Sequence, residues 1–335
     1  LLGVTIPEEY GGLGASYVSY GLVAREVERV DSGYRSMMSV QSSLVMYPIY
    51  AYGSEEQRQK YLPKLASGEW IGCFGLTEPD AGSDPGGMKT TAKKTASGYV
   101  LNGSKAFISG GSYSDAYVCM VRTGEDGPKG ISTVVVENGA RGLSFGALED
   151  KMGWRAQPTS EVQFDDCDVP AENLIGEEGR GFSYAMAGLD GGRLNIAASA
   201  LGGAQAALDR TVAYMGERRA FGKTLDQFQA LQFKLAELET ALQSARVFLR
   251  QAAWKLDRKA PDATKFCAMA KLYVTDRSFE VANDCLQLHG GYGYLADFGV
   301  EKIVRDLRVH QILEGTNEIM RLIVSRALLS ERGQA

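Results

Sequence analysis

The residue best suited to acid–base chemistry is Glu314, which is followed by Gly315 and interrupts a run of apolar residues at helical spacing. Glycine permits the backbone angles that end one helix and begin another, and either Thr316 or Asn317 can cap the second helix. The sequence therefore predicts a carboxylate at a corner between two helices. These residues alone leave open the alternative of an exposed glutamate in an ordinary turn.

Two β-rich segments carry groups that can hold a flat, polar ring. Residues 74–84 run from a strand into a turn rich in Gly and Ser, where free backbone N–H groups and hydroxyls can bind a ring edge or a phosphate. In residues 104–111, Phe107 and Ser109 are two positions apart, so one face of a strand would present an aromatic ring and a hydroxyl. Each segment by itself is also consistent with a plain turn or strand.

Two helix ends carry groups that suit an anionic ligand. Residues 217–223 place guanidinium groups at a helix end, with Gln229 beyond them, and guanidinium is a natural partner for a pyrophosphate. Residues 287–294 end a helix in a glycine turn that permits close backbone approach. The alternative for both segments is a solvated helix end.

Length and composition indicate an ordinary globular protein of two or three packed units, with 335 residues and 44% hydrophobic residues. A net charge of -5 argues against general affinity for nucleic acid or anionic membranes, and no apolar run approaches the roughly 20 residues of a membrane span. The chain begins Leu-Leu-Gly-Val without Met or a basic leader. We expect that the true N-terminus is missing from it.

Cysteine and histidine usage excludes several classes of site. Five widely spaced cysteines suit reduced thiols, which predicts a bacterial cytoplasm or a mitochondrial matrix. The two histidines, His289 and His310, form no metal-ligand motif, so we predict no metal site. Neither a Rossmann fingerprint nor a P-loop motif is present, so any nucleotide cofactor must bind in another way.

The pattern of apolar residues divides the chain into helices, a β unit and a bundle. Helices are expected at 17–30, at 37–51 and from a capping box at Ser54 to about residue 68. Residues 71–176 read as an antiparallel sheet or barrel, with Asn102-Gly103 as a hairpin turn.

After residue 181 the apolar period returns to that of a helix, over 194–215, 228–252 and 263–288 and through the Glu314 segment. These four stretches predict an antiparallel four-helix bundle. We therefore place domains at residues 1–70, 71–178 and 179–335.

Taken together, these motifs resemble the acyl-CoA dehydrogenase family of flavoproteins over essentially the whole chain. The likeness rests on Leu-Thr-Glu-Pro and Gly-Ser-Asp within 76–84, Arg-x-x-Phe-Gly at 218–222, Gln-x-x-Gly-Gly-x-Gly at 287–293, and Glu-Gly-Thr at 314–316. The resemblance implies an α+β multidomain fold: an N-terminal α-helical domain, a central antiparallel β domain and a C-terminal four-helix bundle. It also implies FAD bound without a Rossmann motif, in a homotetramer that is a dimer of dimers.

The resemblance also assigns roles to individual residues, with Glu314 as the catalytic base. FAD would be held by Phe74, Gly75, Leu76, Thr77, Ser83, Phe107, Ile108 and Ser109, and by Arg218, Phe221, Gln229, Gln287, Gly290, Gly291, Thr316, Asn317 and Glu318, several of them reaching a neighbouring subunit's flavin. Substrate contacts would come from Ser83, Asp190, Arg193 and Arg326, with Arg35 and Ser36 as further candidates. Ser109 and Phe107 replace the Thr and Trp of many relatives but keep the hydroxyl and the aromatic ring.

The implied reaction is α,β-dehydrogenation of an acyl-CoA to the trans-2-enoyl-CoA, with electrons passed to an electron-transferring flavoprotein. Residues 20–88 look like glutaryl-CoA dehydrogenases, whereas the chain from about residue 90 on looks like isobutyryl-CoA and short-chain enzymes. We expect a short, branched, isobutyryl-like substrate. The alternatives are oxidative decarboxylation of glutaryl-CoA to crotonyl-CoA, an acyl-CoA oxidase, or an acyl-CoA-binding flavoprotein without dehydrogenase activity.

Overall fold

The structure is a computed structural model that describes residues 1–332. The chain forms two compact units, which we describe separately. Unit 1 comprises residues 1–16, 36–151 and 155–192, and unit 2 comprises residues 17–35, 152–154 and the chain from Arg193 onward. The division into domains at 1–70, 71–178 and 179–335 remains a prediction.

The helices of unit 1 follow the predicted pattern. Helix α2 (Ser32–Ser39), which begins in unit 2, continues through a π-helical stretch (Val40–Met46) into α3 (Tyr47–Tyr52), and this covers the helix expected at 37–51. Helix α4 (Glu55–Ser67) begins with the predicted capping box, in which the Gln57 amide N–H donates to Ser54 Oγ and the Ser54 N–H donates to Gln57 Oε1.

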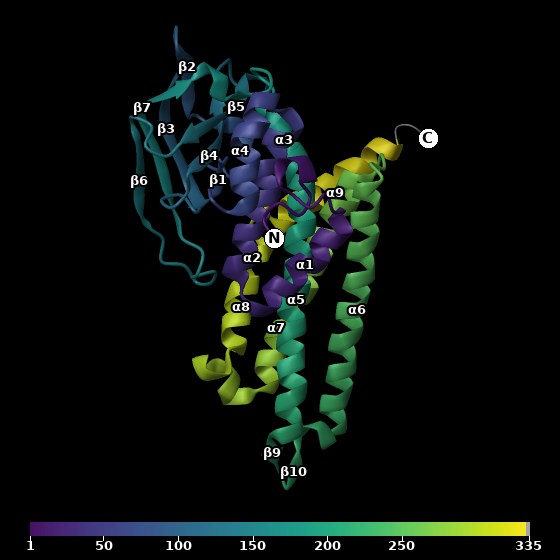
Figure 1. Cartoon of the computed structure of the whole chain (residues 1–335). Helices are drawn as coiled ribbons and strands as arrows, with labels where there is room; N and C mark the ends of the chain where they lie inside the picture. The colour runs from purple at the N-terminus through teal and green to yellow at the C-terminus, as the bar shows by residue number, and fades with distance from the viewer. Residues whose placement is uncertain (333–335) are drawn as a thin grey trace. The chain divides into compact units, whose positions relative to one another are not determined.

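An eight-stranded sheet forms the rest of unit 1, in the order β6-β7-β3-β2-β4-β5-β8, with β1 paired to β4 (Figure 1). It is antiparallel except where β4 meets β1 and β2, which run parallel to it. The central strand β4 is buried on both faces, which explains its unbroken apolar sequence. The strands are β1 (Gly72–Gly75), β2 (Thr91–Lys94), β3 (Gly98–Ser109), β4 (Ala116–Arg122), β5 (Ile131–Glu137), β6 (Leu143–Leu148), β7 (Thr159–Pro170) and β8 (Leu174–Ile175).

The predicted hairpin at Asn102-Gly103 is wrong, because both residues lie inside the long strand β3. The register of β3 against β7 shifts between Leu101 and Gly103, so the glycine marks a bulge. Gly103 has a φ of 140°, and a Cβ built there would lie 2.6 Å from Thr90 Oγ1. The glycine thus permits a close approach within the sheet rather than a turn.

Unit 2 is built on long helices. In Figure 1, α5 and α6 run side by side and are joined at one end by the short strands β9 (Arg219–Ala220) and β10 (Lys223–Thr224). Apolar side chains of α5, α6, α7 and α8 share one core, in which Leu201, Leu242, Val274 and Leu307 are buried. The helices are α1 (Tyr17–Val30), α5 (Gly181–Glu217, whose first twelve residues belong to unit 1), α6 (Gln229–Asp257), α7 (Ala263–Leu288), α8 (Val300–Arg308) and α9 (Asn317–Arg332).

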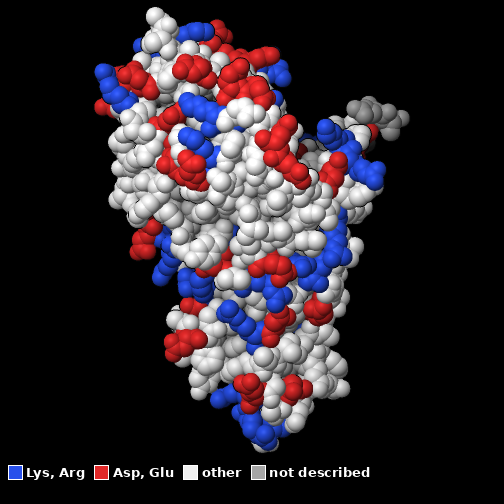
Figure 2. All heavy atoms as spheres, in the orientation of Figure 1, with Lys and Arg blue, Asp and Glu red and all other residues white. Residues whose placement is uncertain are grey.

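The charges on the surface agree with the small net charge, and the helices agree with the lack of a long apolar run in the sequence. On the face that Figure 2 shows, acidic and basic side chains are interspersed. Within residues 1–332, no helix is both long enough and apolar enough to cross a membrane.

Candidate active site

Glu314 stands at a sharp backbone corner in unit 2, between the 3-10 turn Val309–Gln311 and helix α9. Its φ is 57° and that of Gly315 is 86°, so two consecutive residues adopt the left-handed conformation. Thr316 Oγ1 accepts a hydrogen bond from the Ile319 N–H at 3.4 Å and caps α9. The predicted break is confirmed, and of the two proposed caps the structure selects Thr316.

The Glu314 carboxylate is placed to accept a proton. The side chain is half-buried, but Oε2 is fully enclosed and has no hydrogen-bond partner among the described residues. Burial raises the pKa of Glu314 to about 7, against the opposing charges of Arg193, Lys271 and Arg35. Because the enclosed oxygen has lost its water, the group is a stronger base than an exposed glutamate.

A hydrogen-bonded network supports the corner from α7. Lys271 is fully buried, and its Nζ donates to the Gly315 carbonyl oxygen and to Asn317 Oδ1, both at 2.8 Å. Asn317 Nδ2 donates in turn to Thr275 Oγ1 at 3.0 Å and to Asp276 Oδ1 at 2.7 Å. Burial lowers the pKa of Lys271 to about 7, although Glu314 and Asp276 favour its charged form.

A second buried polar cluster involves α1 and α2. Arg35 Nε lies 2.8 Å from Glu28 Oε2, and the Arg35 guanidinium also stacks over the Trp154 ring at 4.6 Å from its centroid. His310 meets Trp154 edge to face, and its Nε2 is 3.7 Å from Glu28 Oε1. Burial raises the pKa of Glu28 and holds the pKa of His310 well below its usual range, so the imidazole is neutral.

Sequence reasoning missed Lys271 and Glu28. A detectable signal existed for Lys271, which interrupts the buried apolar face of α7 formed by Cys267, Ala270 and Val274. Glu28 occupies a buried position of α1. Lys and Glu are rarely fully buried without partners, so such placements indicate a paired or functional group.

The flavin-binding segments predicted within residues 74–84 and 104–111 lie together in unit 1. Phe74 and Gly75 end β1, and the Ala106 N–H donates to the Thr77 carbonyl at 2.8 Å, which ties the segment after β1 to β3. Phe107 sits at a bulge in β3 with a φ of 58° and is 69% exposed. Ile108 is buried and Ser109 is half-buried, so a shared open face for the Phe107 ring and the Ser109 hydroxyl stays a prediction.

A buried ion pair that the sequence did not reveal fixes the loop after β1. Lys105 Nζ on β3 lies 2.7 Å from Glu78 Oε1, and Glu78 also accepts hydrogen bonds from the Lys89 and Thr90 N–H groups. These contacts hold both ends of the loop that carries Ser83, which is itself exposed.

Four predicted residues line one pocket at an end of unit 2. Arg218, Gln287, Gly290 and Gly291 surround it together with aromatic and apolar side chains. The Arg218 guanidinium lies over the Tyr292 ring, 5.1 Å from its centroid. Phe221, at the tip of the β9–β10 hairpin, is 95% exposed, and Gln229 is exposed at the start of α6; neither lines this pocket.

The predicted substrate contacts differ in their placement. Arg193 is buried, and its charge acts on Glu314. Asp190 is half-buried three residues earlier in α5, and Ser36 is buried in unit 1. Arg326 is exposed on α9, nine residues beyond its start and therefore roughly 14 Å along the helix, so the structure does not bring it to the Glu314 corner.

Two residues predicted to bind FAD lie at the start of α9. Asn317 is buried, whereas the neighbouring Glu318 is exposed.

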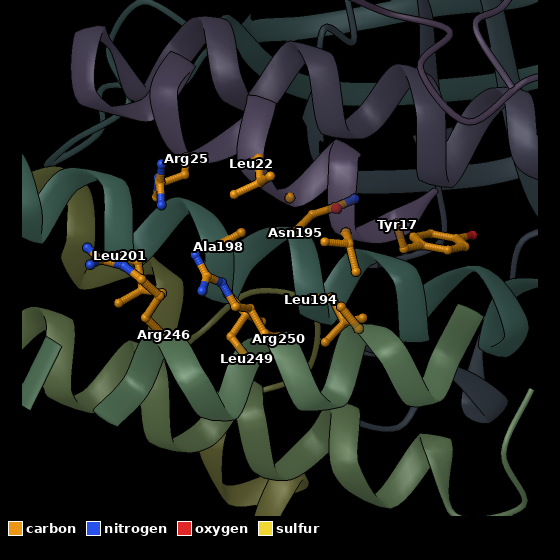
Figure 3. A pocket seen from close by; sticks show the side chains of 13 residues that line it. Tyr17, Leu22, Arg25, Leu194, Asn195, Ala198, Leu201, Arg246, Leu249 and Arg250 are labelled. Atoms are coloured by element: carbon orange, nitrogen blue, oxygen red, sulfur yellow. The ribbon is translucent and has the colours of Figure 1, made fainter. Parts of the chain in front are cut away.

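A further pocket of unit 2 lies between α1, α5 and α6 (Figure 3). Apolar side chains line most of it, and the guanidinium groups of Arg25, Arg246 and Arg250 lie toward one end. None of the predicted site residues lines this pocket.

Comparison with known proteins gives matches along nearly the whole chain. Family models described as the acyl-CoA dehydrogenase N-terminal, middle and C-terminal domains match residues 1–69, 73–167 and 179–329. A mitochondrial isobutyryl-CoA dehydrogenase from Dictyostelium discoideum is 49% identical over 97% of this chain and 78% of its own length.

Solved structures are similar as well. Butyryl-CoA dehydrogenase from Megasphaera elsdenii has a TM-score of 0.95 and 41% identity, covering 98% of this chain and 87% of that one. A glutaryl-CoA dehydrogenase from Mycobacterium smegmatis in complex with FADH2 has a TM-score of 0.92 and 35% identity, covering 98% of this chain and 83% of that one.

Proposed function

This chain belongs to the acyl-CoA dehydrogenase family, whose members use FAD, and we propose that it oxidises a short, branched acyl-CoA such as isobutyryl-CoA to the corresponding 2-enoyl thioester. Glu314 is the catalytic base in this proposal. The observation that supports it most directly is the enclosed Oε2 of Glu314, which lacks a hydrogen-bond partner among the described residues and belongs to a carboxyl whose pKa is about 7.

The chain contributes the proton-transfer half of the reaction. The α hydrogen of a thioester is a very weak acid, so the base must be partly desolvated and rigidly placed. Glu314 meets both conditions, and the cations Arg193 and Lys271 act on its charge. Removal of the α proton to Glu314 is matched by loss of the β hydrogen with its electron pair. FAD, when bound, supplies the acceptor for that hydride.

The residues of this chain fit an FAD molecule shared between two copies. The pocket lined by Arg218 offers a guanidinium to a pyrophosphate, and space is open where a Cβ would stand at Gly290 and Gly291. In unit 1, the exposed Phe107 ring and the Ser109 hydroxyl offer an aromatic surface and a hydrogen-bonding group for a flavin ring. In this proposal FAD contacts these residues, with Thr77 and Ser83 beside the flavin.

We prefer isobutyryl-CoA over glutaryl-CoA because the buried cation Arg35 already forms an ion pair within this chain. A glutaryl group carries a distal carboxylate, and burying that charge requires a cation. Arg35 is a buried cation whose charge lowers the pKa of Glu314, and for this reason glutaryl-CoA is the second candidate. Its guanidinium, however, already forms an ion pair with Glu28 at 2.8 Å, so a dicarboxylate would have to compete with that carboxylate.

We further propose a homotetramer that passes electrons to an electron-transferring flavoprotein, as the family resemblance implies. Phe233, Val247 and Trp254 are separated by multiples of seven residues on α6 and are 61%, 67% and 54% exposed. This apolar stripe suits burial against another copy of the chain. Such an assembly would also let Arg218 and Gln287 reach a neighbouring flavin.

The test is kcat/KM for isobutyryl-, butyryl- and glutaryl-CoA, measured anaerobically with ferrocenium as the acceptor. We expect isobutyryl-CoA to be the best substrate and glutaryl-CoA the poorest. Glutaryl-CoA as the best substrate, with crotonyl-CoA and CO2 as products, would transfer the proposal to the second candidate. Oxygen uptake that matched the ferrocenium rate would identify an oxidase instead.

A further inference from the structure

The most unusual buried group outside the assigned roles is Lys271. It lies on α7 with no exposed side-chain surface, and its Nζ donates hydrogen bonds to the Gly315 carbonyl oxygen and to Asn317 Oδ1. A buried ammonium group is costly unless hydrogen bonds and opposite charges compensate it. Both hydrogen bonds that the structure assigns to Nζ end on the segment that carries the candidate base.

We propose that Lys271 is a positioning residue for Glu314: it holds the left-handed corner through the Gly315 carbonyl and supplies a positive charge that favours the ionised carboxylate. The inference rests on the proposed role of Glu314 as the base. The family resemblance gives Lys271 no role.

The geometry of the corner explains why it needs such support. A left-handed φ of 57° is unfavourable for glutamate, which has a Cβ, so the surrounding structure must hold it there. Gly315 cannot be replaced without strain, because its φ is 86° and a Cβ would meet Met320 Cε at 2.8 Å. Lys271 is bonded to the carbonyl of this same glycine.

Asn317 completes the clamp on the other side of the corner. It receives a hydrogen bond from Lys271 and donates to Thr275 and Asp276, which lie one turn further along α7. One face of α7 therefore binds the backbone at Gly315 and the first residue of α9. A shift of this face would move Glu314, because only Gly315 and Thr316 separate it from Asn317.

The charges around the pair come from several elements. Arg193 on α5 and Arg35 on α2 lower the pKa of Glu314, as Lys271 does. Asp276 and Glu318 raise the pKa of Lys271. Lys271 also acts on the neutral His310. Loss of the Lys271 charge removes one of three cations that favour the Glu314 carboxylate, so its protonated form would gain.

The experiment compares Lys271→Met, which removes the charge and the donors, with Lys271→Arg, which keeps the charge. Lys234→Met is the control, because Lys234 on α6 forms a partly exposed ion pair with Asp284. Each holoenzyme is assayed for flavin bleaching by isobutyryl-CoA from pH 5.5 to 9. The ionisation of Glu314 is followed separately in flavin-free protein by 13C NMR of labelled glutamate carboxyls, assigned by their difference from Glu314→Gln.

We expect Lys271→Met to move both the acid limb of the rate profile and the Glu314 titration to higher pH by about one unit, which is about tenfold in rate below pH 6.5. An additional loss of bleaching rate that is the same at every pH would indicate that the Glu314 corner has moved. Lys271→Arg should return the acid limb of the rate profile to the pH of the wild type but should not recover the full rate. Lys234→Met should match the wild type in both respects.

An unchanged Glu314 titration together with an unchanged rate profile in Lys271→Met would overturn the inference. A lower unfolding temperature with both curves unchanged would overturn it too, because Lys271 would then be only structural. Failure of the wild type to bleach with any acyl-CoA would refute the proposed function, and the NMR titration would still test whether Lys271 controls Glu314.

Discussion

Lys271 Nζ on α7 donates a hydrogen bond of 2.8 Å to the carbonyl oxygen of Gly315, the residue that follows Glu314. The candidate base is thus held through the backbone beside it rather than through its own carboxylate, whose Oε2 has no hydrogen-bond partner among the described residues. This arrangement separates two requirements of a general base. Its position is fixed, yet its reactive atom is left available for a substrate proton.

Glu314→Gln should abolish the reaction while preserving acyl-CoA binding, since the amide keeps the volume of the side chain and loses the base. General acid–base catalysis contributes about 10²–10⁴-fold, so we expect a loss of at least that size in the rate of flavin bleaching. Stopped-flow spectroscopy under anaerobic conditions measures it. The control is Glu237→Gln, which is exposed on α6, and bleaching at the normal rate by Glu314→Gln would mean that another carboxylate is the base.

The pH dependence should follow the ionisation of Glu314. Because the base must be deprotonated and burial raises its pKa to about 7, kcat/KM should rise as the pH approaches 7 and level off above it. Measurements from pH 5 to 9 with isobutyryl-CoA test this. An acid limb near pH 4.5, the range of an exposed glutamate, would contradict the assignment.

The same carboxylate should make folding stability depend on pH. A folded-state pKa above the unfolded value means that the native state binds more protons between the two values, so stability falls as the pH rises from about 4.5 to 7. Glu314→Gln removes this penalty, and its unfolding temperature should exceed that of the wild type by more at pH 8 than at pH 4.5. A constant difference across this range would exclude a raised pKa.

Arg218→Ala should release FAD and weaken assembly together, if one side chain binds the pyrophosphate of a neighbouring copy. We expect a lower ratio of flavin to protein after gel filtration and a shift to smaller species in sedimentation. Arg219→Ala is the matched control, because Arg219 is exposed and its guanidinium bonds to the Gly222 carbonyl within the hairpin. A variant at Arg218 that kept full flavin as a monomer would refute the shared site.

Glu28→Gln should destabilise the protein strongly, because it leaves the buried Arg35 without its carboxylate. Breaking a buried ion pair typically costs about 3–5 kcal/mol, whereas exposed pairs contribute about 0–1 kcal/mol. Glu26→Gln on the same helix is the control, since its pairs with Arg25 and Arg29 are exposed. Chemical denaturation of both variants measures the difference, and equal stabilities would show that the Glu28 pair is not structurally important.

The sequence by itself determined the main helices and placed the sheet within residues 71–176, because these follow from local periodicity and capping. The bounds of α1 and α7 coincide with the predicted ranges, and the capping box at Ser54 lies where Ser-Glu-Glu-Gln placed it. The corner at Glu314-Gly315 was predictable for the same reason, since a glycine after a helical run is a local signal.

Tertiary structure decided what depends on long-range contacts. Asn102-Gly103 has the local chemistry of a hairpin turn, but pairing with β7 keeps it within a strand, and the parallel pairings of β4 leave no mark in the sequence order. Lys271 and Glu28 contact their partners only once the helices are packed. The basicity of Glu314 likewise depends on burial and on charges from α2, α5 and α7, which no local pattern encodes.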